Sequence, residues 1–277
     1  MFSSHFLNFL TSSSIYLALN SSLVVFLGFF LYGTEVSLAT LLAAFLATFS
    51  VYALNKATDK AEDAINRPEI SLKNPKFFLI PSLVALILSL GIGLLDGPWA
   101  DLVLVAPLLI GLFYSVRFSK KVPRLKEVVG VKSILVAFSW AFTGSVLPAL
   151  TKSVNYDLVL LVFIYIFFSL LVNTVLFDVL DLRGDQVSGV RTIPYVLGLR
   201  KTKIFLILMN SCLLIWLVYS ASRGVFLSCM PALVFGVFYG YVMIGHFVNH
   251  RFKRLRAELL VDGEWIPLIA ILRLFVR

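Results

Sequence analysis

The chain has 277 residues, of which 60% are hydrophobic and 14% charged, and its formal net charge is +9. Soluble domains are about 45–50% apolar and about 25% charged, so this composition excludes a soluble globular protein, a disordered chain and a disulfide scaffold. The basic residues do not gather on one soluble face, which argues against nucleic acid as a partner. The composition predicts a polytopic membrane protein.

Apolar segments long enough to cross a bilayer recur along the whole chain. A transmembrane helix needs about 20 mostly apolar residues, and the alternation typical of barrel strands is absent. The sequence predicts an all-α fold with nine such helices in one membrane-embedded domain, 1–277. They form two four-helix sets, an internal repeat of approximately 14–116 and 132–248, plus a last helix around a central cavity. The predicted spans are 14–32, 36–56, 77–95, 100–116, 132–150, 157–180, 203–221, 226–248 and 258–276.

The basic residues indicate how these spans are oriented. Twenty of the 24 Lys and Arg residues lie in the connections after spans two, four, six and eight. Because loops rich in Lys and Arg stay on the cytoplasmic side, the N-terminus and these four loops are predicted to be cytoplasmic. We therefore expect a multi-pass protein of the cell membrane with its C-terminus outside.

A first group of polar side chains lies at the end of span two. Asn55, Asp59 and Asp63 are spaced i, i+4 and i+8, so on a helix they drift only about 40° per step and share one face. The sequence continues into Asn66-Arg67-Pro68, where the proline predicts the end of that helix.

A second group lies at the end of span six. Asp178, Asp181 and Asp185 are spaced i, i+3 and i+7 and again line one stripe of a helix, with Asn173 before them. The segment from Gly189 to Pro194 then predicts a turn into the next span.

The two groups occupy equivalent places in the two halves of the predicted repeat. A charged residue within a span costs about 2.5–3.5 kcal/mol on insertion scales, so both groups need a reason. If the halves bring these helix ends together, divalent cations relieve the repulsion between the aspartates, and oxygen-only ligands favour Mg²⁺. Because Mg²⁺ often shares its ligands with substrate phosphates, the pattern predicts a diphosphate clamp. The alternative is ordinary solvated loop charge.

These motifs resemble those of the UbiA superfamily of intramembrane prenyltransferases. Asn55, Asp59 and Asp63 match the family's N-x-x-x-D-x-x-x-D element, and the second group matches D-x-x-D-x-x-G-D. Two departures are that Lys56 follows Asn55, where many members have aspartate, and that the run after the first motif is shortened. Further matches are the element Gly189, Thr192 and Pro194 and the tyrosine-serine element with a following basic residue, Tyr114, Ser115 and Lys121.

The resemblance implies a Mg²⁺-dependent transfer of an isoprenyl group within the bilayer. The donor is an allylic prenyl diphosphate, from geranyl to geranylgeranyl, and the acceptor is an aromatic quinone precursor or a glycerol-phosphate ether lipid. The resemblance assigns the catalytic role to Asp59, Asp63, Asp181 and Asp185. Magnesium ligands are these four residues and Asp178. Diphosphate contacts are Asn55, Arg67, Tyr114, Ser115, Arg117, Lys121 and Asn173.

Two other classes of membrane protein also carry acidic residues in their spans. Phosphatidyl-transferring enzymes have a single D-G-x-x-A-R element, and Asp262-Gly263 lacks that continuation. A transporter places its acids near the midplane of the bilayer, whereas these lie at the cytoplasmic ends of the spans. The transporter remains the alternative function. A role for Asp262 and Glu264 in the last span is left open.

Overall fold

The computed structural model describes residues 9–58, 65, 74–115, 128–152, 154–248 and 254–275, with the backbone alone at 112–115. All the longer elements in these ranges are helices. They are α2 (Ile15–Tyr32), α3 (Leu38–Thr58), α6 (Lys76–Gly93), α7 (Pro98–Ser115), α8 (Val131–Leu150), α9 (Tyr156–Ser188), α10 (Ile193–Ser222), α11 (Met230–Phe247), α12 (Arg254–Val261) and α13 (Trp265–Phe275), with short 3-10 turns η1 (Leu94–Asp96), η3 (Leu227–Cys229) and η4 (Asp262–Glu264).

Each predicted span coincides with helical structure, and within the described ranges seven helices are long and apolar enough to cross a membrane. The differences lie at the ends and in the last span. Helix α9 extends to Ser188, and α10 begins at Ile193 with a kink at Gly198. The segment predicted as one helix over 258–276 is instead two helices, α12 and α13, joined by the turn η4.

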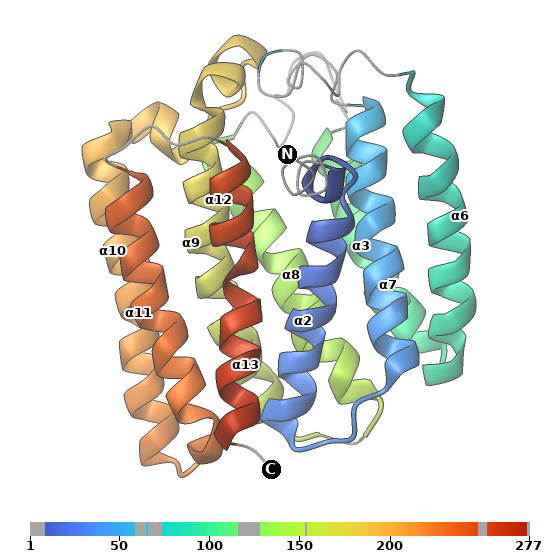
Figure 1. Cartoon of the computed structure of the whole chain (residues 1–277), viewed down its shortest axis with the longest axis vertical. Coiled ribbons are helices and arrows are strands. Elements are labelled where there is room, and N and C mark those ends of the chain that lie inside the picture. The colour runs from blue at the N-terminus through green and yellow to red at the C-terminus, as the bar shows by residue number, and fades with distance from the viewer. Residues whose placement is uncertain are drawn as a thin grey trace.

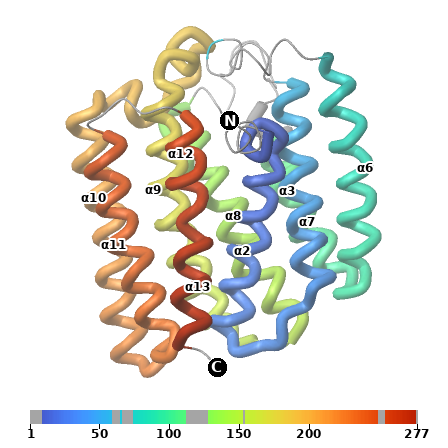
Figure 2. Tube along the Cα trace, in the orientation of Figure 1, coloured from blue at the N-terminus to red at the C-terminus, as the bar shows by residue number. Residues whose placement is uncertain are grey.

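The helices close into a ring. Contacts run from α2 through α3, α6, α7, α8, α9, α10 and α11 to α13, which returns to α2. In Figures 1 and 2, α6 lies at one edge of the molecule and α10 at the other, and α12 and α13 follow one another down the front. Helix α2 begins at the top of Figure 1 and α13 ends at the bottom, so the first and last described helices have their outer ends on opposite sides.

Helices α2 and α8 touch across the middle of this ring. A methyl group on Gly28 would stand 2.4 Å from the carbonyl oxygen of Gly144, and one on Gly144 would meet the side chain of Val24. Such close crossings need small residues, which are common where membrane helices pack. Two cavities lie beside this crossing, and Tyr52, Lys132, Val136 and Trp140 line both of them.

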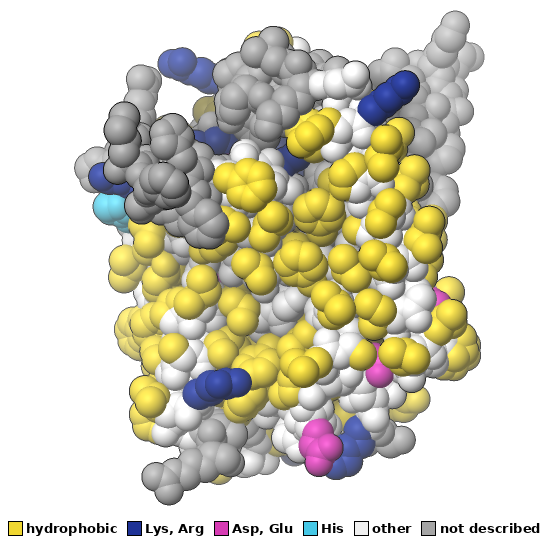
Figure 3. Space-filling model, turned by 45° about the vertical axis from the view of Figure 1, so that its right-hand side comes forward, with side chains coloured by type: hydrophobic (Ala, Val, Ile, Leu, Met, Phe, Trp, Pro, Cys, Tyr) yellow, Lys and Arg dark blue, Asp and Glu magenta, His cyan; other side chains and the backbone are white. Residues whose placement is uncertain are grey.

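The outer surface carries a broad apolar band. Helix α6 alone exposes seven large hydrophobic side chains, namely Phe77, Leu79, Ile80, Leu83, Val84, Ile87 and Leu88. Figure 3 shows hydrophobic side chains over the middle of one face, with charged side chains toward its two ends. Because a water-soluble monomer rarely exposes so large an apolar surface, the helices form a polytopic membrane fold.

Candidate active site

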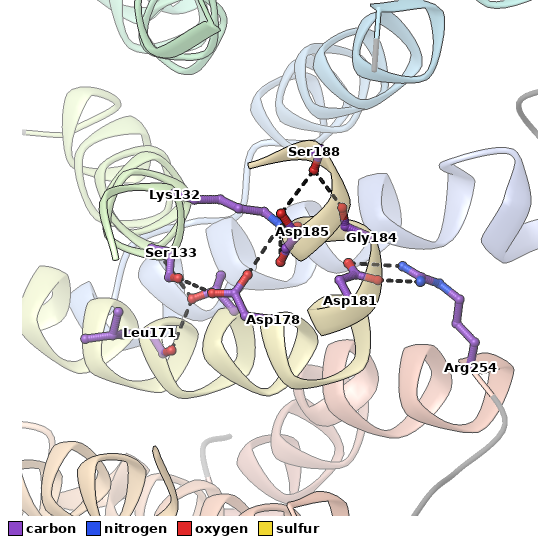
Figure 4. A network of polar contacts seen from close by, with 10 residues as sticks. Lys132, Ser133, Leu171, Asp178, Asp181, Gly184, Asp185, Ser188 and Arg254 are labelled. Atoms are coloured by element: carbon purple, nitrogen blue, oxygen red, sulfur yellow. Dashed lines mark hydrogen bonds and ion pairs between the residues drawn. The ribbon is translucent and has the colours of Figure 1, made fainter. Parts of the chain in front are cut away.

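The last turns of α9 carry the second aspartate group into the interior of the protein. Asp178 and Asp185 are 2% and 1% exposed, whereas the Asp181 side chain is 16% exposed. Gly189 ends the helix with φ of +75°, and the Val190 amide donates to the Asp185 carbonyl. The predicted stripe and the turn that follows it are both present, and Figure 4 shows the three aspartates on neighbouring turns.

The start of α8 places a lysine and a serine against this stripe. The Gly130 amide donates to the Arg191 carbonyl, which fixes the beginning of α8 beside the turn after α9. Lys132 Nζ consequently lies 3.2 Å from Asp185 and 3.4 Å from Asp178. The Ser133 hydroxyl donates a short hydrogen bond to Asp178 (Figure 4). Two of the three aspartates therefore share one ammonium group.

The third aspartate is paired with α12. Arg254 donates through Nη1 and Nη2 to the two oxygens of Asp181, a bidentate arrangement that favours guanidinium over ammonium. Its Nε also donates to Glu258 at 3.0 Å. An arginine side chain stays protonated in proteins, and the carboxylates of Asp181 and Glu258 compensate its charge. Arg254 therefore stays cationic and holds α12 to the end of α9.

Cationic side chains of the protein thus compensate the α9 carboxylates. Within the described ranges, no group of three or more His, Cys, Asp or Glu side chains forms a ready metal site. Lys132 and Arg254 were counted from the sequence only as loop charges. Their contacts join segments 53 and 73 residues apart, so local spacing gives no sign of them.

The first motif is described only at its beginning. Asn55, in the last described turn of α3, lines a cavity. Lys56, the departure from the family pattern, is 5% exposed and donates to the Ser12 carbonyl and the Ser14 hydroxyl, both at 2.6 Å. It thus contacts the turn before α2.

Five predicted site residues lie outside the described residues, namely Asp59, Asp63, Arg67, Arg117 and Lys121. Tyr114 and Ser115, at the end of α7, are described by their backbone alone.

Asn173 lies deeper along α9 than the aspartates. It is 3% exposed, and its Nδ2 donates to the Val261 carbonyl at 3.2 Å. The predicted diphosphate contact is therefore bonded, in this structure, to the end of α12.

Two cavities meet beside Lys132. The first, of about 210 Å³, lies between α2, α3, α7 and α8 and includes Asn55. The second, of about 180 Å³, lies between α2, α8, α9 and the broken last helix and includes Asp178, Asp181 and Arg254. Lys132, Val136 and Trp140, one turn apart on α8, line both cavities together with Tyr52.

The wall between these cavities is held by a hydrogen bond. Trp140 Nε1 donates to Tyr52 Oη at 3.1 Å, and their rings meet edge to face. Both cavities otherwise have mainly apolar walls and reach the charged residues at one end. This arrangement suits two lipid-like molecules whose polar ends meet at Lys132.

The chemistry of the donor set fits magnesium. The α9 stripe offers carboxylate oxygens and no nitrogen or sulfur ligands, and hard oxygen ligands are those Mg²⁺ prefers. Lys132 and Arg254 bring positive charge to the same place, as an anionic phosphate group requires.

The chain is similar in sequence to known membrane enzymes. The sequence profile of the UbiA prenyltransferase family matches residues 10–257. Digeranylgeranylglyceryl phosphate synthase of Natronomonas pharaonis is 30% identical over 58% of this chain, and that of Methanothermobacter thermautotrophicus is 28% identical over 56%. The chain spans 56% and 54% of the length of these curated relatives.

Solved structures show the same fold. A UbiA homolog from Archaeoglobus fulgidus, bound to DMAPP and Mg²⁺, has a TM-score of 0.70 at 16% identity, covering 95% of this chain and 99% of that one. The apo UbiA homolog from Aeropyrum pernix K1 has a TM-score of 0.70 at 15% identity, covering 93% and 98%.

Proposed function

The chain belongs to the UbiA prenyltransferase family, and from this premise we propose that it transfers an isoprenyl group from an allylic prenyl diphosphate to a lipophilic acceptor in the membrane. The observation that carries the proposal is that Asp178, Asp181, Lys132 and Arg254 line one cavity together, while Lys132 also lines the cavity beside it. A diphosphate headgroup would bind there, with its prenyl tail in one of the cavities.

The proposed roles follow from the charge of each group. Asp178, Asp181 and Asp185 would hold magnesium together with Asp59 and Asp63, which lie outside the described residues. When bound, Mg²⁺ supplies Lewis-acid stabilisation of the leaving diphosphate. Lys132 and Arg254, released from their aspartates by the metal, would donate to the diphosphate oxygens. Asn55 would contact the same headgroup from the first cavity. The apolar walls would exclude water from the allylic cation.

We propose a glycerol-phosphate ether lipid as the acceptor. The curated relatives carry the name digeranylgeranylglyceryl phosphate synthase, which supports geranylgeranylglyceryl phosphate in this role. An aromatic quinone precursor is the second candidate, because the cavity walls are apolar and suit a ring as well as a lipid chain.

The proposed membrane architecture has nine spans with the active-site end in the cytoplasm. Helix contacts support the internal repeat. In the set α2, α3, α6 and α7, each helix touches the next one, and the second helix, α3, also touches the fourth, α7. The set α8, α9, α10 and α11 repeats this pattern. The α12–α13 pair is then the ninth span. The basic loops would lie on the cytoplasmic side of the cell membrane.

The test is product formation by the purified chain. Geranyl, farnesyl and geranylgeranyl diphosphates are incubated with Mg²⁺ and, separately, geranylgeranylglyceryl phosphate, hydroxybenzoate and dihydroxynaphthoate, and products are identified by mass. We expect a prenylated product formed only with Mg²⁺ and only with the matching acceptor, and a slower Mg²⁺-dependent release of diphosphate and prenyl alcohol when the acceptor is absent. Transport of a labelled substrate into vesicles without any product would instead support a carrier and contradict the proposal.

A further inference from the structure

The break in the last helix places an additional acid in the second cavity. Helix α12 ends at Val261, and Asp262 begins the turn η4 before α13 starts at Trp265. Asp262 and Trp265 both line the second cavity, which also contains Asp178 and Asp181. Asp178 and Asp181 come from α9, whereas Asp262 comes from a different wall of the cavity.

Three other helices hold this break open. Tyr16 of α2 donates to the Leu259 carbonyl at 2.9 Å, Tyr239 of α11 to that of Leu260 at 2.7 Å, and Asn173 of α9 to that of Val261 at 3.2 Å. Three side chains thus donate hydrogen bonds to three consecutive backbone carbonyls at the end of α12, where a helix has no further amide donors of its own. The position of Asp262 is therefore set by contacts with three helices.

Gly263 keeps the break close to α2. A methyl group at this position would stand 2.2 Å from the Tyr16 hydroxyl. The Asp-Gly pair therefore combines an acid that lines the cavity with a small residue packed against the Tyr16 hydroxyl.

The proposed transfer needs a group that accepts a proton. As the bond from C1 of the prenyl group to the diphosphate oxygen breaks, both electrons leave with the diphosphate. A lone pair of the acceptor's hydroxyl oxygen then forms the new bond to C1, and that oxygen must lose its proton. The α9 carboxylates are the proposed magnesium ligands, so the base for this step should lie off their stripe and beside the acceptor.

We propose that Asp262 is the catalytic base for the acceptor, which lies in the second cavity with its hydroxyl against the broken last helix. The inference rests on the proposed function and names the residue that receives the proton. The oxygen–hydrogen bond of the acceptor breaks, its electrons stay on the ether oxygen, and the proton passes to the Asp262 carboxylate. Ionisation of the donor at the aspartate stripe does not require Asp262.

The test separates ionisation from transfer in Asp262→Asn. The full chain in detergent is given Mg²⁺ and geranylgeranyl diphosphate, with and without geranylgeranylglyceryl phosphate, and three products are measured: diphosphate, prenyl alcohol and ether. General-base catalysis is worth about 10²–10⁴-fold, so we expect ether formation to fall by about 10²-fold or more. Prenyl alcohol formed by water should continue at the wild-type rate. Asp262→Glu, which keeps a carboxylate, should recover part of the ether formation.

Asp157→Asn is the matched control, because Asp157 is an exposed acid at the opposite end of α9 and should leave all three products unchanged. Wild-type ether formation in Asp262→Asn would overturn the inference. So would a folded Asp262→Asn protein that has lost release of diphosphate as well, because the residue would then serve the donor or the structure. A wild-type chain that releases no diphosphate from any prenyl donor contradicts the proposed function itself, and the inference with it.

Discussion

At the scale of single residues, Lys132 links most parts of the candidate site. It bridges Asp178 and Asp185 and lines both cavities. The Asp185 side chain is 1% exposed, so this carboxylate depends on Lys132 for its counter-charge. Breaking a buried ion pair on one side leaves the other charge buried and uncompensated, which costs more than the pair itself contributes.

Lys132→Met should therefore destabilise the protein, by an amount on the order of 3 kcal/mol. We expect a lower midpoint of thermal unfolding in detergent, and partial recovery in the double variant Lys132→Met/Asp185→Asn, which removes both charges. Lys201→Met, on an exposed site of α10, is the control and should unfold like the wild type. If Lys132→Met also unfolds like the wild type, the ion pairs do not stabilise the stripe.

The sequence was sufficient to identify the aspartates but not their partners. The i, i+3, i+7 spacing of Asp178, Asp181 and Asp185 is local and survives in α9. Lys132 and Arg254 reach them only because α8 and α12 pack against α9, and such contacts leave no periodicity in the sequence. Asn173 was predicted at the site, and its bond to Val261 depends on a helix break that apolar composition does not reveal.

At the scale of elements, the crossing of α2 and α8 positions the site. The first two residues of α8 after Val131 contact the aspartates, so a shift of α8 would move Lys132 and Ser133. Gly28 and Gly144 allow the two backbones to approach, with no room for a methyl group on either side. Close backbone approach of this kind is characteristic of helix pairs in membranes.

Gly28→Ala should force the helices apart, because its methyl group would meet the Gly144 carbonyl oxygen at 2.4 Å and backbone cannot rotate away. Overpacking of this kind costs about 1–3 kcal/mol, so we expect a lower unfolding midpoint together with reduced product formation. The control is Gly91→Ala in α6, where nothing lies within 4 Å of the added methyl group. If the two variants are equally stable, α2 and α8 can move apart at no cost in stability, which would contradict the prediction.

The break between α12 and α13 is a feature that apolar composition does not predict. The segment 258–276 has the apolar content of a span, and the sequence predicts one helix there. Tyr16, Tyr239 and Asn173 come from three other helices and bond the carbonyls at the break. The acidic pair Asp262 and Glu264 was unusual in the sequence, but its meaning depends on those distant partners.

At the scale of the whole molecule, the ring of helices gives the chain two distinct ends. The start of α2 and the end of α13 lie at opposite ends in Figure 1, as an odd number of crossings requires. The end of α9, which carries the aspartate stripe, and the beginning of α12, which carries Arg254, lie at the end of the molecule from which α2 starts (Figure 1). The positive-inside rule would place this end in the cytoplasm.

Cysteine labelling tests this orientation. In a background with Cys212→Ala and Cys229→Ala, single cysteines replace Lys152 or Arg191, both of which are exposed. A membrane-impermeant maleimide should label Lys152→Cys on intact cells and Arg191→Cys only in inverted vesicles. Labelling of both variants from the same side would contradict the proposed arrangement of spans.

The central claim is that the α9 stripe holds the metal and diphosphate of a prenyl donor. The most direct measurement is Mg²⁺-dependent diphosphate release from geranylgeranyl diphosphate, in the presence of acceptor, by Asp181→Ala and by Asp157→Ala. Loss of electrostatic stabilisation at a leaving group is worth about 10²–10³-fold, so release per folded Asp181→Ala protein should fall by about 100-fold or more. Asp157→Ala should release diphosphate at the wild-type rate. Full activity in folded Asp181→Ala would contradict the account.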